Sequence, residues 1–180
     1  MPAPSPSLPL ALVPVMDIEA SGFGAGSYPI EIGFVLSDGD AYCTLITPHP
    51  DWTHWDPAAQ AVHGIARESL FSHGKTASAI CADLDERVAD TTLFSDSWCH
   101  DYTWLNLLYA AAGRVPRFKL ASLHSIVGEI EQSVWEATRM EVQRRDGAGR
   151  HRASADARVL QRTVWELMTA GIVPLHCVAA

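Results

Sequence analysis

The segment VMDIEAS, residues 15–21, reads as a buried strand that carries two acids. Successive side chains of a strand point to opposite faces, so Asp17 and Glu19 share one face and Ile18 lies on the other. Two carboxylates held side by side on a core strand lose hydration and repel each other, which costs free energy unless a positive charge compensates. The segment therefore predicts a core strand that needs a positively charged partner.

The length and composition fit one globular domain. The chain has 180 residues, of which 48% are hydrophobic and 19% charged, enough for one substantial core and few for two. We expect residues 1–9, which contain four prolines, to form a flexible leader and residues 10–180 to form a single domain. The net charge of -8 argues against a protein that coats nucleic acid by bulk attraction, but it allows an enzyme with a local basic groove.

The cysteines and the apolar stretches indicate the compartment. The cysteines are scattered, without a Cys-x-x-Cys pair, at Cys43, Cys81, Cys99 and Cys177. This pattern suits free thiols in a reducing compartment better than a disulfide framework or a thiolate zinc site. The apolar stretch near the start has no basic residue before it and is interrupted by Pro9 and Pro14, so we expect no signal peptide. Because no apolar run reaches membrane-spanning length, we expect a cytoplasmic protein that does not bind a membrane.

Apolar periodicity and turn signals predict an α/β chain. Strands are expected at residues 12–20 (fully paired after Pro14), on both sides of the turn 37–40, and at 91–95. Helices are expected at 57–64, 77–89, 99–113, 122–142 and 153–171, with a flexible connection at 144–150. Three early strands followed by alternating helices and strands indicate a sheet with helices packed on it.

Two of the expected helices turn an acid toward the core near their first turn. In one, Asp101 precedes the apolar residues Trp104 and Leu105 by three and four positions and so lies on their face. In the other, Asp156 precedes Leu160 by four positions. Either acid alone would be explained by the favourable interaction of a carboxylate with a helix N-terminus.

Together with Asp17 and Glu19, however, these residues make four acids on core-facing positions. Such a set needs cations, because unpaired carboxylates near a core are destabilising. Divalent metal is the economical source of positive charge. Mg²⁺ or Mn²⁺ prefers carboxylate oxygen and keeps positions open for water and phosphate.

Four ordered segments resemble one enzyme superfamily. DIEASG at 17–22 matches the D-x-E motif of the DEDD 3′–5′ exonucleases, the superfamily of ribonuclease T and the polymerase proofreading subunits. SDSWCHDYTWL at 95–105 resembles the second motif, whose acid is Asp101, and HRASAD at 151–156 fits the third motif, H-x-x-x-x-D. VHGI at 62–65 is similar to a segment commonly carried between the first two motifs. The order and spacing of all four segments make the resemblance specific.

The third motif resembles the histidine branch of this superfamily, DEDDh. The tyrosine branch would place its base four residues before the aspartate, where this chain has Arg152. Five residues along a helix rotate a side chain well away from the stripe that carries Asp156, so we expect His151 to precede the helix. The Gly-containing residues before it would let this histidine close over a substrate.

The resemblance implies an RNase H-like α/β fold, with a mixed sheet of about five strands flanked by helices. It also implies a metal-dependent 3′–5′ exonuclease that hydrolyses phosphodiester bonds at the 3′ ends of single-stranded nucleic acid or short oligonucleotides. Two divalent ions, Mg²⁺ or Mn²⁺, would be held by Asp17, Glu19, Asp101 and Asp156. His151 would be the general base.

Further residues are expected beside the substrate. The first motif and the VHGI segment contribute Ala20, Ser21, Gly22, His63 and Gly64, although a turn-forming role explains His63 equally well. Arg150 comes from a basic cluster that holds seven of the thirteen Lys and Arg residues: Arg139, Arg144, Arg145, Arg150, Arg152, Arg158 and Arg162. This cluster either guides a phosphate backbone or forms a solvated helix end. The side chains of four aromatic residues could either stack on a terminal base or pack in the core: Phe23, Trp52, Trp55 and Tyr102.

Two other functions remain open. A metal-dependent phosphodiesterase or phosphatase on small nucleotides would differ from the exonuclease in substrate length alone. A catalytically silent domain of the same fold would only bind nucleic acid or protein, but the four retained acids argue against it. The choice between DNA and RNA is open, and so is a homodimer, which some stand-alone family members form.

Overall fold

The computed structural model describes residues 12–146 and 151–174, which form helices around one five-stranded sheet. The strands are β1 (Val15–Ala20), β2 (Pro29–Val35), β3 (Ala41–Leu45), β4 (Thr92–Ser95) and β5 (Lys119–Ser122). Their order is β3-β2-β1-β4-β5, with antiparallel pairing of β1 with β2 and of β2 with β3, and parallel pairing of β1 with β4 and of β4 with β5. This mixed sheet with flanking helices confirms the expected RNase H-like α/β fold.

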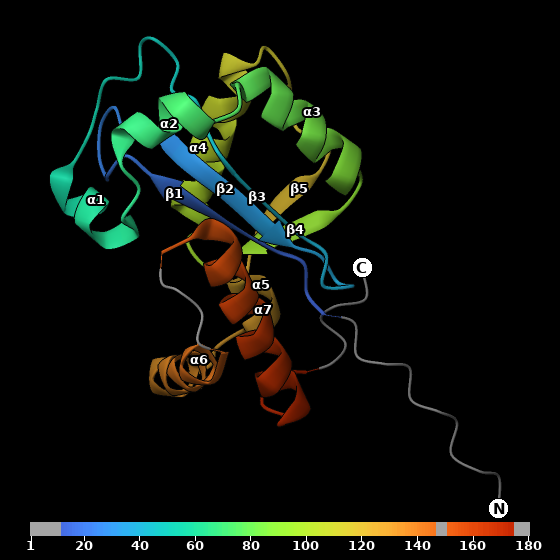
Figure 1. Cartoon of the computed structure of the whole chain (residues 1–180). Coiled ribbons are helices and arrows are strands. Elements are labelled where there is room, and N and C mark those ends of the chain that lie inside the picture. Colours follow the sequence, from blue (N-terminus) through green and yellow to red (C-terminus); the bar gives the residue numbers. More distant parts are fainter. Residues whose placement is uncertain (1–11, 147–150, 175–180) are drawn as a thin grey trace, which may run out of the picture.

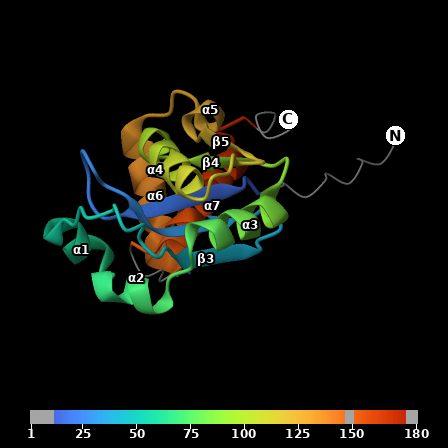
Figure 2. The same ribbon diagram turned by 90° about the horizontal axis from the view of Figure 1, so that it is seen from above.

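The helices cover both faces of the sheet (Figures 1 and 2). On one face lie α3 (Ala77–Val88) and α4 (Trp98–Ala111). The other face is crossed by α7 (Ala153–Thr169), with α5 (His124–Val127) and α6 (Gln132–Asp146) beside it. Figure 1 shows α1 (Pro57–His63) near the end of β1, followed by α2 (Arg67–His73).

The alternation of side chains along β1 separates two apolar clusters. Met16 and Ile18 belong to the cluster that contains Leu105 of α4, whereas Val15 belongs to the cluster that contains Leu160 of α7. Since residues two apart share a face, Asp17 and Glu19 lie on the α7 side of the strand. The two acids therefore come after Val15 on the same face of β1, and they face the start of α7.

A glycine in β2 allows α7 to approach the acids closely. Gly33 pairs with Asp17 in the antiparallel register of β1 and β2. A Cβ atom at Gly33 would lie 2.8 Å from the carbonyl carbon of Ala153 and 2.9 Å from the Cα of Ser154, closer than packed atoms can come. The missing side chain thus lets the first turn of α7 rest on the sheet beside Asp17.

The predicted helix over residues 122–142 is wrong. Ser122 ends β5, and the following residues form the short α5, whose C-cap Gly128 has φ 63. This positive φ, which glycine adopts without a steric penalty, takes the chain out of the helix, and α6 begins separately at Gln132. Arg144, Arg145 and Asp146 continue α6 instead of starting a flexible connection, and residues 147–150 lie outside the described residues.

The early strands and the remaining predicted helices are found close to their expected positions. Two elements, α2 and β5, were not expected. Cys43, Cys81 and Cys99 are free thiols, whereas Cys177 and the expected leader lie outside the described residues. Within residues 12–146 and 151–174, no helix is long and apolar enough to cross a membrane.

Candidate active site

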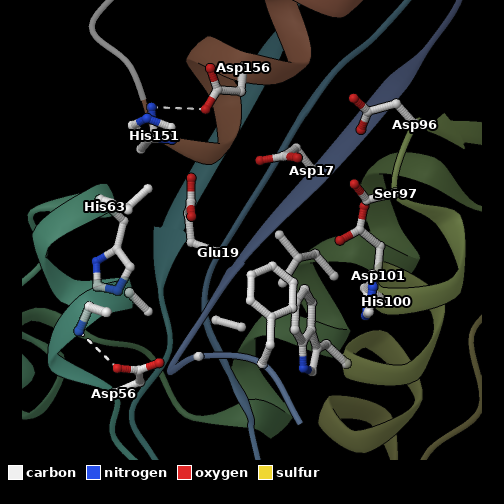
Figure 3. A pocket seen from close by; sticks show the side chains of 18 of the residues that line it. Asp17, Glu19, Asp56, His63, Asp96, Ser97, His100, Asp101, His151 and Asp156 are labelled. Carbon is white, nitrogen blue, oxygen red and sulfur yellow. Dashed lines mark hydrogen bonds between the residues drawn. The ribbon is translucent and has the colours of Figure 1, made fainter.

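Four acids from three elements line one cavity of about 490 Å³. Asp17 and Glu19 project from β1, Asp101 from the first turn of α4, and Asp156 from the first turn of α7. Figure 3 shows these carboxylates turned toward a common space, with His151 next to Asp156. One carboxylate oxygen each of Glu19 and Asp156 and one ring nitrogen of His151 lie within 4.8 Å of one another. The fold thus brings the motif residues together.

The acids in this cavity raise one another's pKa values. Burial, followed by the charges of Asp101 and Glu19, raises the pKa of Asp17 well above its usual value. Burial and then Asp156 raise the pKa of Glu19 to about 7. Burial raises the pKa of Asp101 to about 8, although the hydroxyl of Ser95 donates a hydrogen bond to this carboxylate and opposes the shift. The charged forms of the acids are therefore poorly stabilised by the protein itself.

No salt bridge reaches these four acids from any residue of the described ranges 12–146 and 151–174. A compact group of carboxylates without a cationic partner fits a divalent metal ion, because Mg²⁺ and Mn²⁺ take oxygen ligands and their charge would offset the repulsion. Within the described residues, Glu19, Asp156 and His151 are the group whose ligand atoms lie close enough together to hold one ion, and Asp17 and Asp101 line the same cavity.

The backbone around His151 is fixed by two carboxylates. His151 has φ 61, in the left-handed region, and its N–H donates to Asp156 Oδ2 over 2.9 Å. The next residue, Arg152, is the N-cap of α7 and donates from Nε and Nη2 to Glu31 Oε1 over 2.9 and 2.6 Å. Glu31 is fully buried in β2 and also accepts the N–H of Ala153 over 2.9 Å. The histidine is thereby held at the edge of the cavity, before the helix, as expected.

Sequence reasoning missed Glu31 as part of the site. It stands opposite Glu19 in the pairing of β2 with β1, and it is an acid within the apolar strand PIEIGFV. The same argument that drew attention to Asp17, an acid where a core strand needs apolar residues, also applies to Glu31. Its partner, Arg152, is 121 positions away in the sequence and could not be identified.

His63 of α1 also lines the cavity, on the side away from Asp101 in Figure 3. It is only 6% exposed, and its Nδ1 accepts the N–H of Ile65 over 3.0 Å. Burial lowers the pKa of His63, which favours the neutral ring. With Nδ1 accepting, the proton of the neutral ring is on Nε2, a buried atom that has no partner among the described residues.

The Gly-rich turn after β1 is held by contacts with the loop before α1. The buried Ser21 hydroxyl bonds His54 Nδ1 over 3.0 Å and accepts the N–H of Tyr28 over 3.0 Å. Gly22 has φ 142, and a Cβ atom there would lie 2.7 Å from Asp56 Cβ. These contacts give Ser21 a structural role and explain why glycine follows it.

The residues expected beside the substrate therefore divide into three groups. Ala20, Gly22 and His63 line the cavity. Ser21 and Gly64, the left-handed C-cap of α1, are not part of its wall. Arg150 lies outside the described residues.

Three aromatic rings form one side of the cavity. Phe23 is 72% exposed and contacts His100 edge-on, with ring centroids 5.3 Å apart. His100 in turn stacks on Trp104 at 5.6 Å. All three rings line the cavity, whereas Trp52, Trp55 and Tyr102 do not. Trp104 is buried in an apolar cluster, as its spacing predicted, and it also lines the cavity; sequence reasoning did not identify this second role or the position of His100.

The basic cluster is largely neutralised by nearby acids. Three of its arginines form surface ion pairs at 2.7 to 2.9 Å: Arg144 with Glu141, Arg145 with Glu166, and Arg162 with Asp146. These contacts favour a solvated helix end over a phosphate guide for those three residues. Arg139 differs, because it lines the cavity and contacts Asp96 over a longer 3.4 Å.

The sequence matches no protein-family model and no curated protein. Solved structures of exonuclease I share its fold. One is a zinc-bound complex of the Escherichia coli enzyme with single-stranded DNA, with TM-score 0.65 and 14% identity, covering 92% of this chain and 42% of that chain. Exonuclease I from Methylocaldum szegediense gives TM-score 0.62 and 15% identity, covering 90% of this chain and 42% of that one.

A further E. coli exonuclease I structure, with TM-score 0.64 and 14% identity, covers 93% of this chain and 42% of its own length. This chain thus spans about two fifths of the proteins it resembles. At such identities the likeness establishes a common fold.

Proposed function

We propose that this protein is a metal-dependent 3′–5′ exonuclease of the DEDDh type that acts on single-stranded nucleic acid. The observation that carries the proposal is the meeting of four carboxylates and one histidine in a single cavity, without an ion pair from the described residues. Without a bound cation, the acids would repel the negative charge of a phosphodiester. With divalent ions bound, the same cavity suits chemistry on a phosphodiester.

Asp17, Glu19, Asp101 and Asp156 would hold the divalent ions. When bound, these ions would activate water and stabilise negative charge on the phosphoryl oxygens. Burial and then the charges of its acidic neighbours, Asp101 and Glu19 first, raise the pKa of Asp17, so its carboxylate has the most to gain from a bound cation. We therefore assign Asp17 the largest share in neutralising and positioning the ions.

His151 is the proposed general base. Its ring would take one proton from the attacking water as the water oxygen bonds to phosphorus. The bond from phosphorus to the 3′ oxygen of the remaining strand breaks, and that oxygen then takes a proton from solvent. Histidine suits this step because imidazole exchanges protons near neutral pH. The contact of its backbone with Asp156 would keep the ring at the cavity edge.

The remaining walls suit a nucleotide at the end of a strand. Phe23, with His100 and Trp104 behind it, offers an exposed face on which a base can stack. The Nε2–H of His63 is a free donor for an oxygen of the sugar or phosphate. Because exonuclease I shares the fold and has been solved with single-stranded DNA, DNA is the first substrate to test.

The proposal is tested by cleavage of 5′-labelled single-stranded DNA and RNA of one sequence, in Mg²⁺, in Mn²⁺ and in EDTA. We expect a ladder that shortens from the 3′ end and disappears in EDTA. The strand that is cleaved faster, DNA or RNA, indicates the substrate class. His151→Ala should slow the chemical step by about 100-fold or more and leave metal affinity, measured by calorimetry, nearly unchanged.

Three outcomes would contradict parts of this assignment. Equal loss of activity and of metal affinity in His151→Ala would make His151 a metal ligand instead of a base. Cleavage of dinucleotides or nucleotide esters alone would favour the phosphodiesterase of small nucleotides. Absence of all cleavage, with metal and oligonucleotide still bound, would favour the silent binding domain.

A further inference from the structure

A second cavity adjoins the candidate active site. Its volume is about 430 Å³, and it shares Asp96 and Arg139 with the wall of the first cavity. We call it the adjoining cavity; its other lining residues, from α5, α6 and their flanks, are Leu123, His124, Val127, Ile130, Gln132, Trp135 and Glu136. None of the motifs that resemble the exonucleases contributes a residue other than Asp96.

The floor and rim of the adjoining cavity differ in chemistry. Leu123 and Val127 are buried, and Ile130 and Trp135 pack against the same apolar cluster. The rim carries polar side chains, among them Gln132, whose Nε2 donates to Glu136 Oε1 over 2.7 Å. An apolar floor with an indole and a polar rim suits a flat heteroaromatic ring with donors and acceptors on its edge. The volume is within the usual range of small-molecule sites, about 300–1,000 Å³.

The boundary between the two cavities is an ion pair that a phosphate can displace. Arg139 Nη1 lies 3.4 Å from Asp96 Oδ2, and the two side chains are 40% and 26% exposed. A long, partly hydrated contact of this kind is weak. Guanidinium groups bind phosphate oxygens in a planar, two-pronged geometry, so Arg139 can exchange the carboxylate of Asp96 for a phosphodiester.

We propose that the adjoining cavity binds the base of the penultimate nucleotide, and that Arg139 holds a non-bridging oxygen of the phosphate that joins it to the terminal one. This inference rests on the proposed function, since it takes the terminal nucleotide to occupy the first cavity. It makes a strand of two or more nucleotides the preferred substrate. It also gives the penultimate base, and not only the terminal one, an effect on the rate.

The first test needs only the wild-type protein. Three oligonucleotides would be compared: one normal, one with an abasic unit at the penultimate position, and one with an abasic unit four positions further from the 3′ end. We expect the first cleavage of the penultimate abasic strand to have a kcat/KM about 10-fold lower, the size of one stacked base, and the distant abasic strand to behave as normal. Equal rates on all three strands would overturn the proposal.

The p-nitrophenyl ester of thymidine 5′-monophosphate separates this inference from the proposed function. It offers a terminal nucleotide without a penultimate one. Its slow hydrolysis by the wild type would show that the chemistry is present even where the abasic test is negative. If neither the ester nor any oligonucleotide is cleaved, the proposed function fails first.

Variants then locate the effect. Trp135→Ala should bring the normal and penultimate abasic strands to the same rate, whereas Trp165→Ala, which replaces a partly exposed tryptophan on α7, should preserve the difference between them. Arg139→Gln should lower kcat/KM about 10-fold on normal strands. Arg144→Gln, on the same helix and paired with Glu141, is its control. If a folded Trp135→Ala still cleaves the normal strand faster than the penultimate abasic strand, the proposed contact with Trp135 is wrong. If Arg139→Gln and Arg144→Gln have equal rates on normal strands, the proposed contact with Arg139 is wrong.

Discussion

Two buried aspartates of neighbouring helices have opposite surroundings. Asp85 of α3 is 5% exposed and accepts hydrogen bonds from the hydroxyl of Tyr109 over 2.9 Å, from Arg114 over 2.8 Å and from the N–H of Arg117 over 3.3 Å. Asp101 of α4 is 1% exposed and accepts a hydrogen bond from Ser95. The first is part of a closed network, whereas the second faces a cavity.

This difference shows in the charge that each residue prefers. Burial alone would raise the pKa of Asp85, but hydrogen bonds from Arg114, Tyr109 and Arg117 bring it below its usual value. Burial raises the pKa of Asp101 to about 8, and Ser95 does not prevent this. Burial raises the pKa of both acids, and the number and charge of their hydrogen-bond donors decide whether this effect is overcome. The acids in the cavity have a stability cost that a bound cation would remove.

The largest effect is expected from Asp17→Asn. Removing one carboxylate from the proposed metal ligands should lower kcat about 1,000-fold or more, since metal ions supply several kcal/mol of transition-state stabilisation. The metal-free variant should be at least as stable as the wild type, because a poorly stabilised charge is gone. Asp38→Asn, at an exposed turn, is the control. Unchanged turnover of Asp17→Asn would refute the metal site.

The second effect concerns the pair that holds His151. Arg152→Ala leaves Glu31 buried with only the N–H of Ala153 as partner, and should reduce the free energy of unfolding by about 3 kcal/mol. Glu31→Gln keeps an acceptor for that N–H and should lose less. Both variants should lower kcat more than they raise KM, since the backbone before α7 is loosened. If urea titrations show that Arg152→Ala and Glu31→Gln lose the same free energy of unfolding, the expected larger cost of an unpaired buried carboxylate is wrong.

Asp85→Asn should show the reverse of the Asp17 variant. It weakens the hydrogen bonds from Tyr109 and Arg114, so the free energy of unfolding should fall by about 2 kcal/mol. Below its melting temperature the variant should match the wild type in the proposed nuclease activity per folded molecule. Chemical denaturation and the cleavage assay together measure both properties. A gain in stability would show that the network is not the cause of the low pKa.

The smallest effect is a pH dependence that changes with metal. Glu19 and Asp101 have pKa values of about 7 and 8 in the folded, metal-free protein, above those of the unfolded chain. They therefore favour folding at low pH, and this contribution is lost as the pH rises through these values. Asp85, whose pKa is lowered, stabilises the folded protein at neutral pH. This contribution is lost only as the pH falls into the acid range.

In EDTA, Tm should consequently fall between about pH 4, near the pKa values of these acids in the unfolded chain, and about pH 8, the highest of their folded values. The fall should become shallower in Asp101→Asn. Added Mg²⁺ should raise Tm most at the alkaline end, where the acids are charged. A Tm that rises with pH in EDTA would contradict the electrostatics of the cavity.

The amino-acid sequence by itself determined the local geometry. Alternation placed Asp17 and Glu19 on one face of β1, helical spacing turned Asp101 inward, and the five-residue offset from Asp156 put His151 before α7. These properties depend on the periodicities of strand and helix, which neighbouring residues specify. The roles proposed for these residues stay predictions until the assays above are done.

Tertiary structure decided what depends on distant segments. Three contacts join residues that no local pattern connects. They are the pairing of β5 with β4, the ion pair of Glu31 with Arg152, and the ion pair of Asp96 with Arg139. The helix break at Gly128 is different, because it follows from the positive φ of a single glycine and is therefore a local feature that the apolar spacing around it concealed. Long-range contacts arise from how whole elements pack, so the sequence indicated the acids while only the fold showed the cavity they share.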